Sequence, residues 1–267
     1  MKLMFIGAHP DDGDGRLGGL AARTIERGGQ ALFVSATSGN AGHHEMKPDA
    51  LARRRKEEAR RAGAVIGADY LVLDHDDGRL TPSVEIREEI ITLIRNYRPD
   101  LLLTCRPFDY HADHRAAGQL VMDASYLLTV PLICPHAPLM RQMPVICYTC
   151  DGFQKPLPFQ ADVAVGVDEY FDRKVEMLAS HESQFFEWIP FNGGYLDQVP
   201  QDGTERREWF RRRCEERFGD TARRFRHKLV ERYGARKGRK IRYAEVFEIC
   251  EYGRRPDTEL IEELFPR

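Results

Sequence analysis

A chain of 267 residues, 42% of them hydrophobic, is long enough to bury one substantial core. Its formal net charge of −2 gives no overall attraction to a polyanion, so the composition does not favour a nucleic-acid partner. No apolar run approaches the roughly eighteen residues that a membrane span needs. We therefore expect no membrane association. The six cysteines show no regular spacing, so we expect reduced thiols in a cytoplasmic protein.

Apolar runs and stretches of helical spacing alternate through the first half of the chain. In chain order we expect a strand at residues 2–8, a helix at 16–27, a strand at 30–36, a helix at 50–66, a strand at 70–73, a helix at 83–97, a strand at 100–104 and a helix at 115–128. Strands that alternate with helices four times predict an α/β fold. We expect a Rossmann-like, doubly wound and mostly parallel sheet with helices on both faces.

The second half is less regular. Strands are expected at residues 145–150 and 162–167, followed by a helix at 169–180 with Asp168 as its N-cap. Residues 204–242 contain sixteen lysines and arginines against six acidic residues, with apolar residues recurring every four positions. This pattern predicts two amphipathic helices that break near Gly219, and we interpret their basic residues as a solvated face rather than a nucleic-acid surface.

The loop after the first strand contains Gly13-x-Gly15-x-x-Gly18, a pattern found in dinucleotide-binding proteins. However, His9, Asp11 and Asp12 come between the strand and the glycines, and two carboxylates would repel a diphosphate. The acidic residue expected at the end of the second strand is also absent. We therefore interpret the glycines as allowing a tight turn and close packing of the first helix on the sheet.

A second polar cluster, His111-Ala112-Asp113-His114, follows the fourth strand. In a Rossmann-like sheet the first and fourth strands flank the point where the strand order reverses and ligands bind. We expect the two clusters to meet there. His9, Asp12 and His114 would then supply two imidazoles and one carboxylate, the ligand set of a catalytic Zn²⁺ ion, although Fe²⁺ accepts the same set.

The remaining side chains of the two clusters complete a hydrolytic set. Asp11 would act as the general base for a metal-bound water, whose pKa falls to roughly 7. Protonated His111 would stabilise an oxyanion and act as a general acid, with Asp113 orienting it and raising its pKa. Isolated loop residues are the alternative interpretation, but titratable residues at two loops that the sheet brings together favour a functional site.

Several segments also resemble one known family. They are Ala8-His9-Pro10-Asp11-Asp12, Gly18-Gly19, Thr37-Ser38-Gly39-Asn40-Ala41-Gly42, Arg55-x-x-Glu58, Asp77-Gly78-x-Leu80, His111-x-Asp113-His114, and Lys174 with His181, Ser183 and Gln184. Together they resemble the LmbE-like (PIG-L) superfamily of zinc-dependent N-acetylglucosaminyl de-N-acetylases over most of residues 1–188. Asn40 departs from the pattern, because it stands where the family has a glutamate.

The resemblance implies an LmbE-like catalytic domain at residues 1–190, with a C-terminal extension at 191–267 packed on the same domain. It implies hydrolysis of an N-acetyl group from an N-acetylglucosamine-like amino sugar or its conjugate. It also implies that Arg55 and Asp77 contact the sugar, and we add Tyr110 and His181 as candidate substrate-binding residues. From the residues alone, Arg55 would be a solvated helix charge and Asp77 a turn residue.

Other functions remain open at this stage. One is a metal-dependent amidase that acts on a non-sugar or thioether-conjugate amide, and another is a non-catalytic metal- or carbohydrate-binding protein. Mere binding does not require Asp11 and His111, so we favour the enzyme, with a small-molecule amino-sugar substrate as its partner. The sequence does not decide whether the protein is a homo-oligomer. We interpret His43 and His44 as exposed loop residues.

Overall fold

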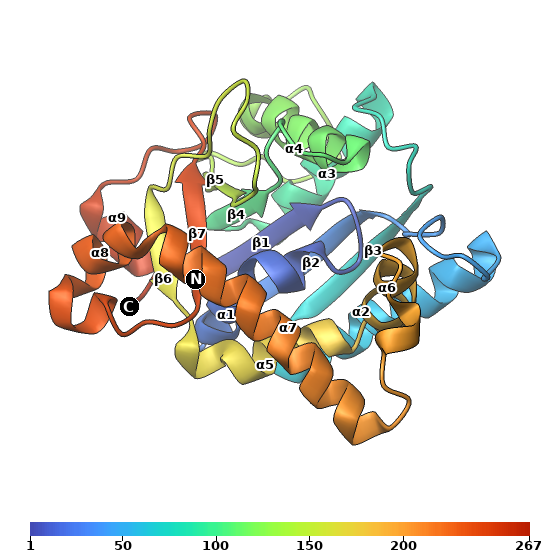
Figure 1. The fold of residues 1–267 in the computed structure, drawn as a ribbon. Coiled ribbons are helices and arrows are strands. Elements are labelled where there is room, and N and C mark those ends of the chain that lie inside the picture. Colours follow the sequence, from blue (N-terminus) through green and yellow to red (C-terminus); the bar gives the residue numbers. More distant parts are fainter.

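A seven-stranded sheet in the order β3-β2-β1-β4-β5-β7-β6 runs through the computed structural model, which describes residues 1–267 (Figure 1). Its strands are β1 (Lys2–Gly7), β2 (Gln30–Thr37), β3 (Asp69–His75), β4 (Leu101–Thr104), β5 (Val145–Thr149), β6 (Val163–Gly166) and β7 (Ala244–Ile249). Pairs among β1 to β5 are parallel, and β7 is antiparallel to both of its neighbours. The predicted mostly parallel α/β sheet is confirmed, but β7 was not predicted.

The central strand β1 is buried on both faces, as its continuous apolar run predicted. Leu3 and Phe5 belong to one hydrophobic core, whereas Met4 and Ile6 belong to the core on the opposite face. This alternation follows from the two-residue period of a strand. The sheet therefore separates two cores, and polar residues gather only where its strands end.

Helices cover both faces of the sheet (Figure 1). They are α1 (Asp12–Glu26), α2 (Pro48–Ile66), α3 (Val84–Tyr97), α4 (Ala112–Ser125), α5 (Phe171–Ala179), α6 (Ile189–Asn192), α7 (Gly203–Arg224), α8 (Arg226–Gly238) and α9 (Thr258–Leu264). One face carries α3 and α4, and the other carries α1, α2 and α5, with the long α7 crossing outside α1 and α5 (Figure 1).

The glycines of the first loop allow α1 to lie close to the sheet. A Cβ atom on Gly13 would be 2.3 Å from Phe33 Cδ1, and one on Gly19 would be 2.7 Å from Val167 Cβ. These separations are shorter than van der Waals contact allows, so any larger residue would push the helix outward. This geometry supports the packing interpretation of the glycines.

The C-terminal extension fixes a bend in α1. Helical geometry is interrupted at Leu17, where φ is −148°. The Glu245 carboxylate of β7 accepts hydrogen bonds from the N–H groups of Gly19 and Leu20, each at 2.8 Å. Glu245 also pairs with Lys174 of α5 at 2.6 Å, and both side chains are only 1% exposed. Glu245 thus caps the second half of α1 and neutralises a buried lysine.

Two local predictions are wrong. Asp168 does not cap a helix, because its Oδ1 accepts hydrogen bonds from the N–H groups of Arg242 (2.9 Å) and Tyr243 (3.1 Å) just before β7, and α5 begins only at Phe171. The tail helices break at Phe225 rather than near Gly219, which lies inside α7. For Asp168, contacts with the segment just before the unpredicted β7 outweigh the local sequence signal.

Two further observations concern membrane-spanning helices and the cysteines. None of the helices combines the length and apolar character that crossing a bilayer requires. All six cysteines are unpaired.

We predict that Glu245→Ala lowers the free energy of unfolding by about 3–5 kcal/mol, because it leaves the Lys174 ammonium buried without a partner. Urea denaturation followed by circular dichroism measures the change. Glu251→Ala is the matched control, because that side chain is 82% exposed and we expect a loss below about 0.5 kcal/mol. The double variant Lys174→Met/Glu245→Gln should recover most of the loss; if it did not, the unpaired charge would not be the cause.

Candidate metal centre and active site

The two polar clusters meet at the carboxyl ends of β1 and β4. These strands are parallel neighbours, with Ile6 beside Thr104, so the loops that follow them leave the sheet at the same edge. His9 Nδ1 lies 3.2 Å from His114 Nε2, although the two residues are 105 positions apart. The clusters therefore lie together at the point where the strand order reverses.

Asp12 joins the two imidazoles. Its Oδ2 accepts hydrogen bonds from the N–H groups of Ala8 (3.0 Å) and His9 (2.9 Å), and its Oδ1 lies 3.2 Å from His114 Nε2. Burial alone would raise the pKa of Asp12, but the charges of His114, Arg16 and His9 hold it well below its usual value. Asp12 is also the first residue of α1, where the helix dipole favours a negative charge.

Carboxylates bind the outer nitrogen of each imidazole. His9 Nε2 lies 3.0 Å from Asp77 Oδ1, and His114 Nδ1 lies 2.9 Å from Asp109 Oδ1. If these outer nitrogens carry the protons, the inner nitrogens are left as bare acceptors that face each other and Asp12. Metal-binding histidines are held in this way in many proteins.

The two inner nitrogens and the two carboxylate oxygens of Asp12 have the spacing of metal ligands. Besides the two separations of 3.2 Å, His9 Nδ1 lies 3.8 Å from Asp12 Oδ2. Ligand atoms about 2.1 Å from a tetrahedral zinc ion would be about 3.4 Å from one another. His9, Asp12 and His114 thus form a group that fits a metal ion, with the two imidazoles and one carboxylate that the sequence suggested.

The electrostatics of the cluster favour a cation. Burial alone would lower the pKa of His9, but the Asp113, Asp77 and Asp12 carboxylates raise it to about 10. The pKa of His114 is also raised, since Asp12 and Asp109 outweigh its burial. Surroundings that stabilise a proton on both imidazoles will also stabilise a metal ion in place of those protons.

Asp11 is held beside this group by Arg55 of α2. Asp11 Oδ1 accepts a hydrogen bond from Arg55 at 2.8 Å, and Arg55 is only 1% exposed. Gly39 makes this approach possible, because its φ is +66° and a Cβ atom there would lie 2.5 Å from Arg55 Nη1. The solvated charge that helical periodicity alone predicted for Arg55 is therefore wrong.

His111 is the N-cap of α4. Its Nδ1 accepts a hydrogen bond from the N–H of Asp113 at 3.2 Å, which leaves Nε2 as the protonated donor of a neutral ring. The His111 ring lies 4.6 Å from that of His9 between centroids. Burial and the charges of His9 and His114 lower the pKa of His111. The raised pKa that the sequence analysis expected is therefore wrong.

Asp113 does not orient the His111 ring through its side chain. Its carboxylate accepts hydrogen bonds from the N–H groups of Gly78 (2.6 Å) and Leu80 (3.2 Å). Asp113 thus fixes the turn after β3 that carries Asp77. Burial would raise the pKa of Asp77, but its hydrogen bond with His9 and the His9 and Arg55 charges lower it to about 2.

The two other candidate substrate residues differ in exposure. Tyr110 is 72% exposed and lies at the rim, with its ring 5.7 Å from that of His111 between centroids. His181 is fully buried, and its Nε2 lies 2.9 Å from Asp14 Oδ2 beneath the first loop. This contact supports the start of α1, and the substrate-binding role of His181 stays a prediction.

Sequence reasoning missed Asp109 and Arg16. Arg16 Nη2 lies 3.4 Å from Asp109 Oδ2, and Arg16 Nε lies 3.7 Å from Asp12 Oδ1. The available signals were positional: Asp109 precedes His111 by two residues in the same loop, and Arg16 follows Asp12 by one helical turn. Both residues surround the outer side of His114.

The expectation that His43 and His44 are exposed is also wrong. The His43 side chain is 3% exposed and lies 2.8 Å from Glu187 Oε2, while the His44 ring stacks 4.0 Å from that of Phe191. Glu187 belongs to a π-helical turn, Ser183–Trp188, which precedes α6. This turn and the loop after β2 form a wall beside Arg55.

The sequence and fold are similar to those of known proteins. Residues 4–125 match the PIG-L family, described as GlcNAc-PI de-N-acetylase. The chain is 31% identical over 207 residues to the diacetylchitobiose deacetylase of Thermococcus kodakarensis, a span that covers 71% of this chain and 74% of that protein.

Two solved structures share the fold over nearly the whole chain. The N,N'-diacetylchitobiose deacetylase of Pyrococcus horikoshii, solved with its inhibitor MPG, has a TM-score of 0.69 and 22% identity and covers 97% of this chain and 88% of its own. The 4-carboxy-2-hydroxymuconate hydratase GalB of Pseudomonas putida KT2440 has a TM-score of 0.72 and 19% identity and covers 96% and 98%. The fold alone therefore does not decide the reaction.

The family match and the identity with a deacetylase over most of both chains do decide the family. The chain belongs to the PIG-L (LmbE-like) family of de-N-acetylases, and it is a hydrolase.

Proposed function

We propose that the protein removes the N-acetyl group from an N-acetylglucosamine-like amino sugar or its conjugate, with a divalent metal ion held by His9, Asp12 and His114. The convergence of one carboxylate oxygen and two imidazole nitrogens within 4.8 Å carries this proposal. The diacetylchitobiose deacetylase relative supports the substrate class. The donor set suits Zn²⁺, and Fe²⁺ is the second choice.

Side chains suited to a sugar gather on one side of this site. A Cβ atom on Gly42 would lie 3.3 Å from Arg55 Nη1 and 3.6 Å from both Asp77 Oδ2 and Trp188 Cδ1. Thus a guanidinium, a carboxylate and an indole border the same small residue. Charged groups bind sugar hydroxyls, and an aromatic face packs against the apolar face of a sugar ring. Arg55 and Asp77 are therefore proposed as sugar contacts, and Trp188 joins them.

The residues around the ligand group supply the proton transfers. A bound metal ion lowers the pKa of its water and polarises the acetamide carbonyl. Asp11, fixed by Arg55, accepts the proton of the attacking water on a carboxylate oxygen. The Nε2–H of neutral His111 donates to the oxyanion of the tetrahedral intermediate. Asp11 then returns its proton to the amine nitrogen as the C–N bond breaks, which releases acetate and the free amino sugar.

We predict that Asp11→Asn lowers kcat by about 10²–10⁴-fold, because the amide cannot accept the proton of the water. Metal content should not change, since Asp11 is outside the proposed ligand group. Acetate release from N-acetylglucosamine and diacetylchitobiose, with and without a chelator, measures the activity, and elemental analysis measures the metal. Asp172→Asn, at a carboxylate that is 79% exposed on α5, is the control.

Each outcome of this experiment has a definite meaning. Full activity of Asp11→Asn would remove the general-base role from this residue. Wild-type protein that binds metal but releases no acetate from any amino sugar would contradict the proposed substrate class, and a panel of non-sugar and thioether-conjugate amides would then be tested. Failure to act on every amide would favour a binding protein.

We predict that Asp109→Asn weakens metal binding by about 10–100-fold, since a neutral amide holds the His114 imidazole less firmly in the required tautomer. Competition with a chromogenic chelator measures the affinity for Zn²⁺. Asp123→Asn is the control, because its carboxylate accepts a hydrogen bond only from Gln119 on the same helix. An unchanged affinity of Asp109→Asn would show that His114 needs no carboxylate partner.

A further inference from the structure

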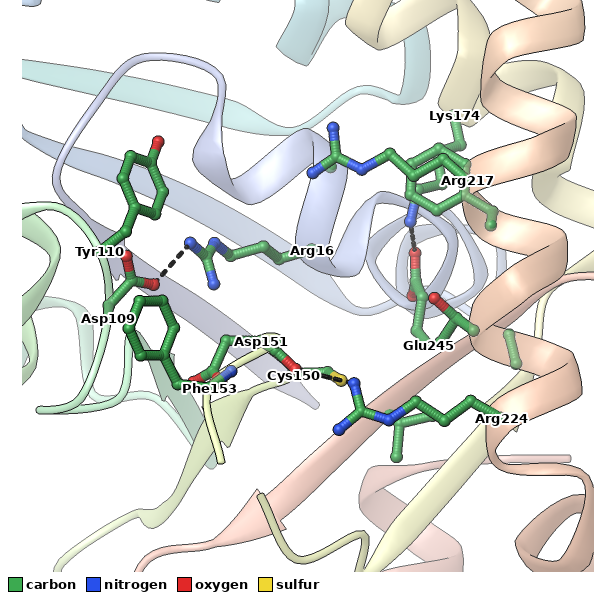
Figure 2. Close-up of a pocket in the computed structure, with 16 residues that line it drawn as sticks. Arg16, Asp109, Tyr110, Cys150, Asp151, Phe153, Lys174, Arg217, Arg224 and Glu245 are labelled. Carbon is green, nitrogen blue, oxygen red and sulfur yellow. Dashed lines mark hydrogen bonds and ion pairs between the residues drawn. The ribbon is translucent and has the colours of Figure 1, made fainter. Parts of the chain in front are cut away.

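A second feature of the site lies on the side opposite Trp188, toward β5 and β7. A pocket of about 320 Å³ opens there, and three residues of the catalytic region, Arg16, Asp109 and Tyr110, form one of its walls (Figure 2). Helix α7 forms the facing wall with Arg217, Phe218, Thr221 and Arg224. The pocket is thus shared between the catalytic loops and the C-terminal extension.

The carboxylates of this pocket are already neutralised. Asp109 is held by His114 and Arg16, and Glu245 is paired with Lys174 at 2.6 Å. The third, Asp151, accepts from Arg106, with 3.2 Å between Asp151 Oδ1 and the nearest guanidinium nitrogen. No acidic group in the pocket is left to neutralise a further cation.

The two arginines of α7 that line this pocket have no carboxylate partner. Neither Arg217 nor Arg224 takes part in an ion pair, and the hydrogen bond that Arg224 makes runs to the backbone oxygen of Asp151 at 3.1 Å. Figure 2 shows both side chains extending from α7 into the pocket, with the Arg16 guanidinium across from them. The pocket therefore carries unbalanced positive charge.

The spacing along α7 explains why these two arginines share one face. Arg217, Thr221 and Arg224 are separated by four and three residues, so they follow one another along the same side of the helix. Thr221 stands between the two arginines in this row and also lines the pocket. Arginine binds carboxylates and phosphates through two parallel hydrogen bonds, so this row suits an oxyanion.

Two other arginines of α7 make contacts outside the pocket. Arg211 pairs with Asp172 at 2.7 Å, and Arg213 packs over the ring of Tyr195 at 4.4 Å. Arg217 and Arg224 are the arginines of α7 that line the pocket. A pocket of about 320 Å³ fits one small anionic group.

We propose that this pocket binds an oxyanion group, a carboxylate or a phosphate, carried by the non-sugar part of the substrate. Assigning the anion to the substrate rests on the proposed function, because the pocket adjoins the catalytic site through Arg16 and Tyr110. The amino sugar lies toward Trp188 and Arg55, and the anionic part lies toward α7. The C-terminal extension thereby selects among amino-sugar conjugates.

The first experiment measures anion binding without any reaction. Inorganic phosphate and succinate are titrated calorimetrically into the wild-type protein, the double variant Arg217→Gln/Arg224→Gln and the control Arg212→Gln, an exposed arginine of α7 outside the pocket. We expect the double variant to bind the preferred anion at least about ten-fold more weakly, since it loses charge-assisted hydrogen bonds. Anion binding to the metal centre is common to all three proteins and does not produce this difference.

The second experiment measures selectivity among substrates. Acetate release is followed with N-acetylglucosaminyl conjugates that carry a neutral, a carboxylate or a phosphate group. In the double variant we expect KM to rise about ten-fold for one anionic class and to stay unchanged for the neutral conjugate, with kcat unaffected. Which class responds distinguishes a carboxylate from a phosphate.

Three results would overturn the proposal: equal anion binding by the wild type and the double variant, an equal loss in Arg212→Gln, or an equal rise in KM for neutral and anionic conjugates. If no conjugate is deacetylated by the wild type, the proposed function fails. Anion binding then still decides whether the pocket is an oxyanion site.

Discussion

Four carboxylates contact two imidazoles where β1 and β4 end, and this concentration of negative charge constrains much of the surrounding structure. They are Asp12, Asp77, Asp109 and Asp113, and a fifth carboxylate, Asp11, precedes Asp12 in the same loop. Buried like charges are costly unless cations or N–H donors neutralise them. Arg55 from α2 binds Asp11, and Arg16 from α1 lies beside Asp12 and Asp109. Backbone N–H groups donate hydrogen bonds to the carboxylates of Asp12 and Asp113.

The negative charge of the cluster is not fully neutralised between the two inner imidazole nitrogens and Asp12, and this is where we expect the reaction. The two imidazoles have their outer nitrogens on Asp77 and Asp109, so the inner nitrogens meet Asp12 with no donor between them unless protons are added. The high pKa of His9 expresses this need for positive charge. A divalent ion satisfies the need with a single centre and retains an open position for water. The same crowding of carboxylates therefore explains why the group fits a metal ion.

Sequence reasoning succeeded where local pattern and sheet topology agree. β1 is a continuous apolar run, and the rule that ligands bind where strand order reverses brought His9 and His114 together. It failed where a residue's environment depends on distant partners. Arg55 follows the helical charge pattern, but its burial results from Asp11 and from the positive φ of Gly39. The sequence of α2 alone does not predict that Arg55 is buried.

The C-terminal extension shows the same limitation more strongly. β7 was not predicted, although it contains Val246, Phe247 and Ile249; it enters the sheet between β5 and β6, draws Asp168 away from a helix cap and supplies Glu245 to α1. Only resemblance, not residue pattern, suggested Asp77 as a sugar contact. In the structure Asp113 fixes the turn that carries Asp77, through the N–H of Gly78. Such contacts link segments that no local window of sequence contains.

The groups proposed for the reaction and the walls proposed to select the substrate come from different segments of the chain. The proposed catalytic groups come from the loops after β1 and β4, whose positions the sheet dictates. The walls come from later and less regular segments: the π-helical turn with Trp188 on one side and α7 with Arg217 on the other. A hydratase shares this fold over nearly the full chain, so the sheet itself is compatible with different reactions. In this chain Glu245 connects the catalytic region with the wall formed by α7, because it caps the helix that carries Arg16 and also borders the α7 pocket. A change in α7 can therefore alter which conjugate is held without moving the atoms that cleave it.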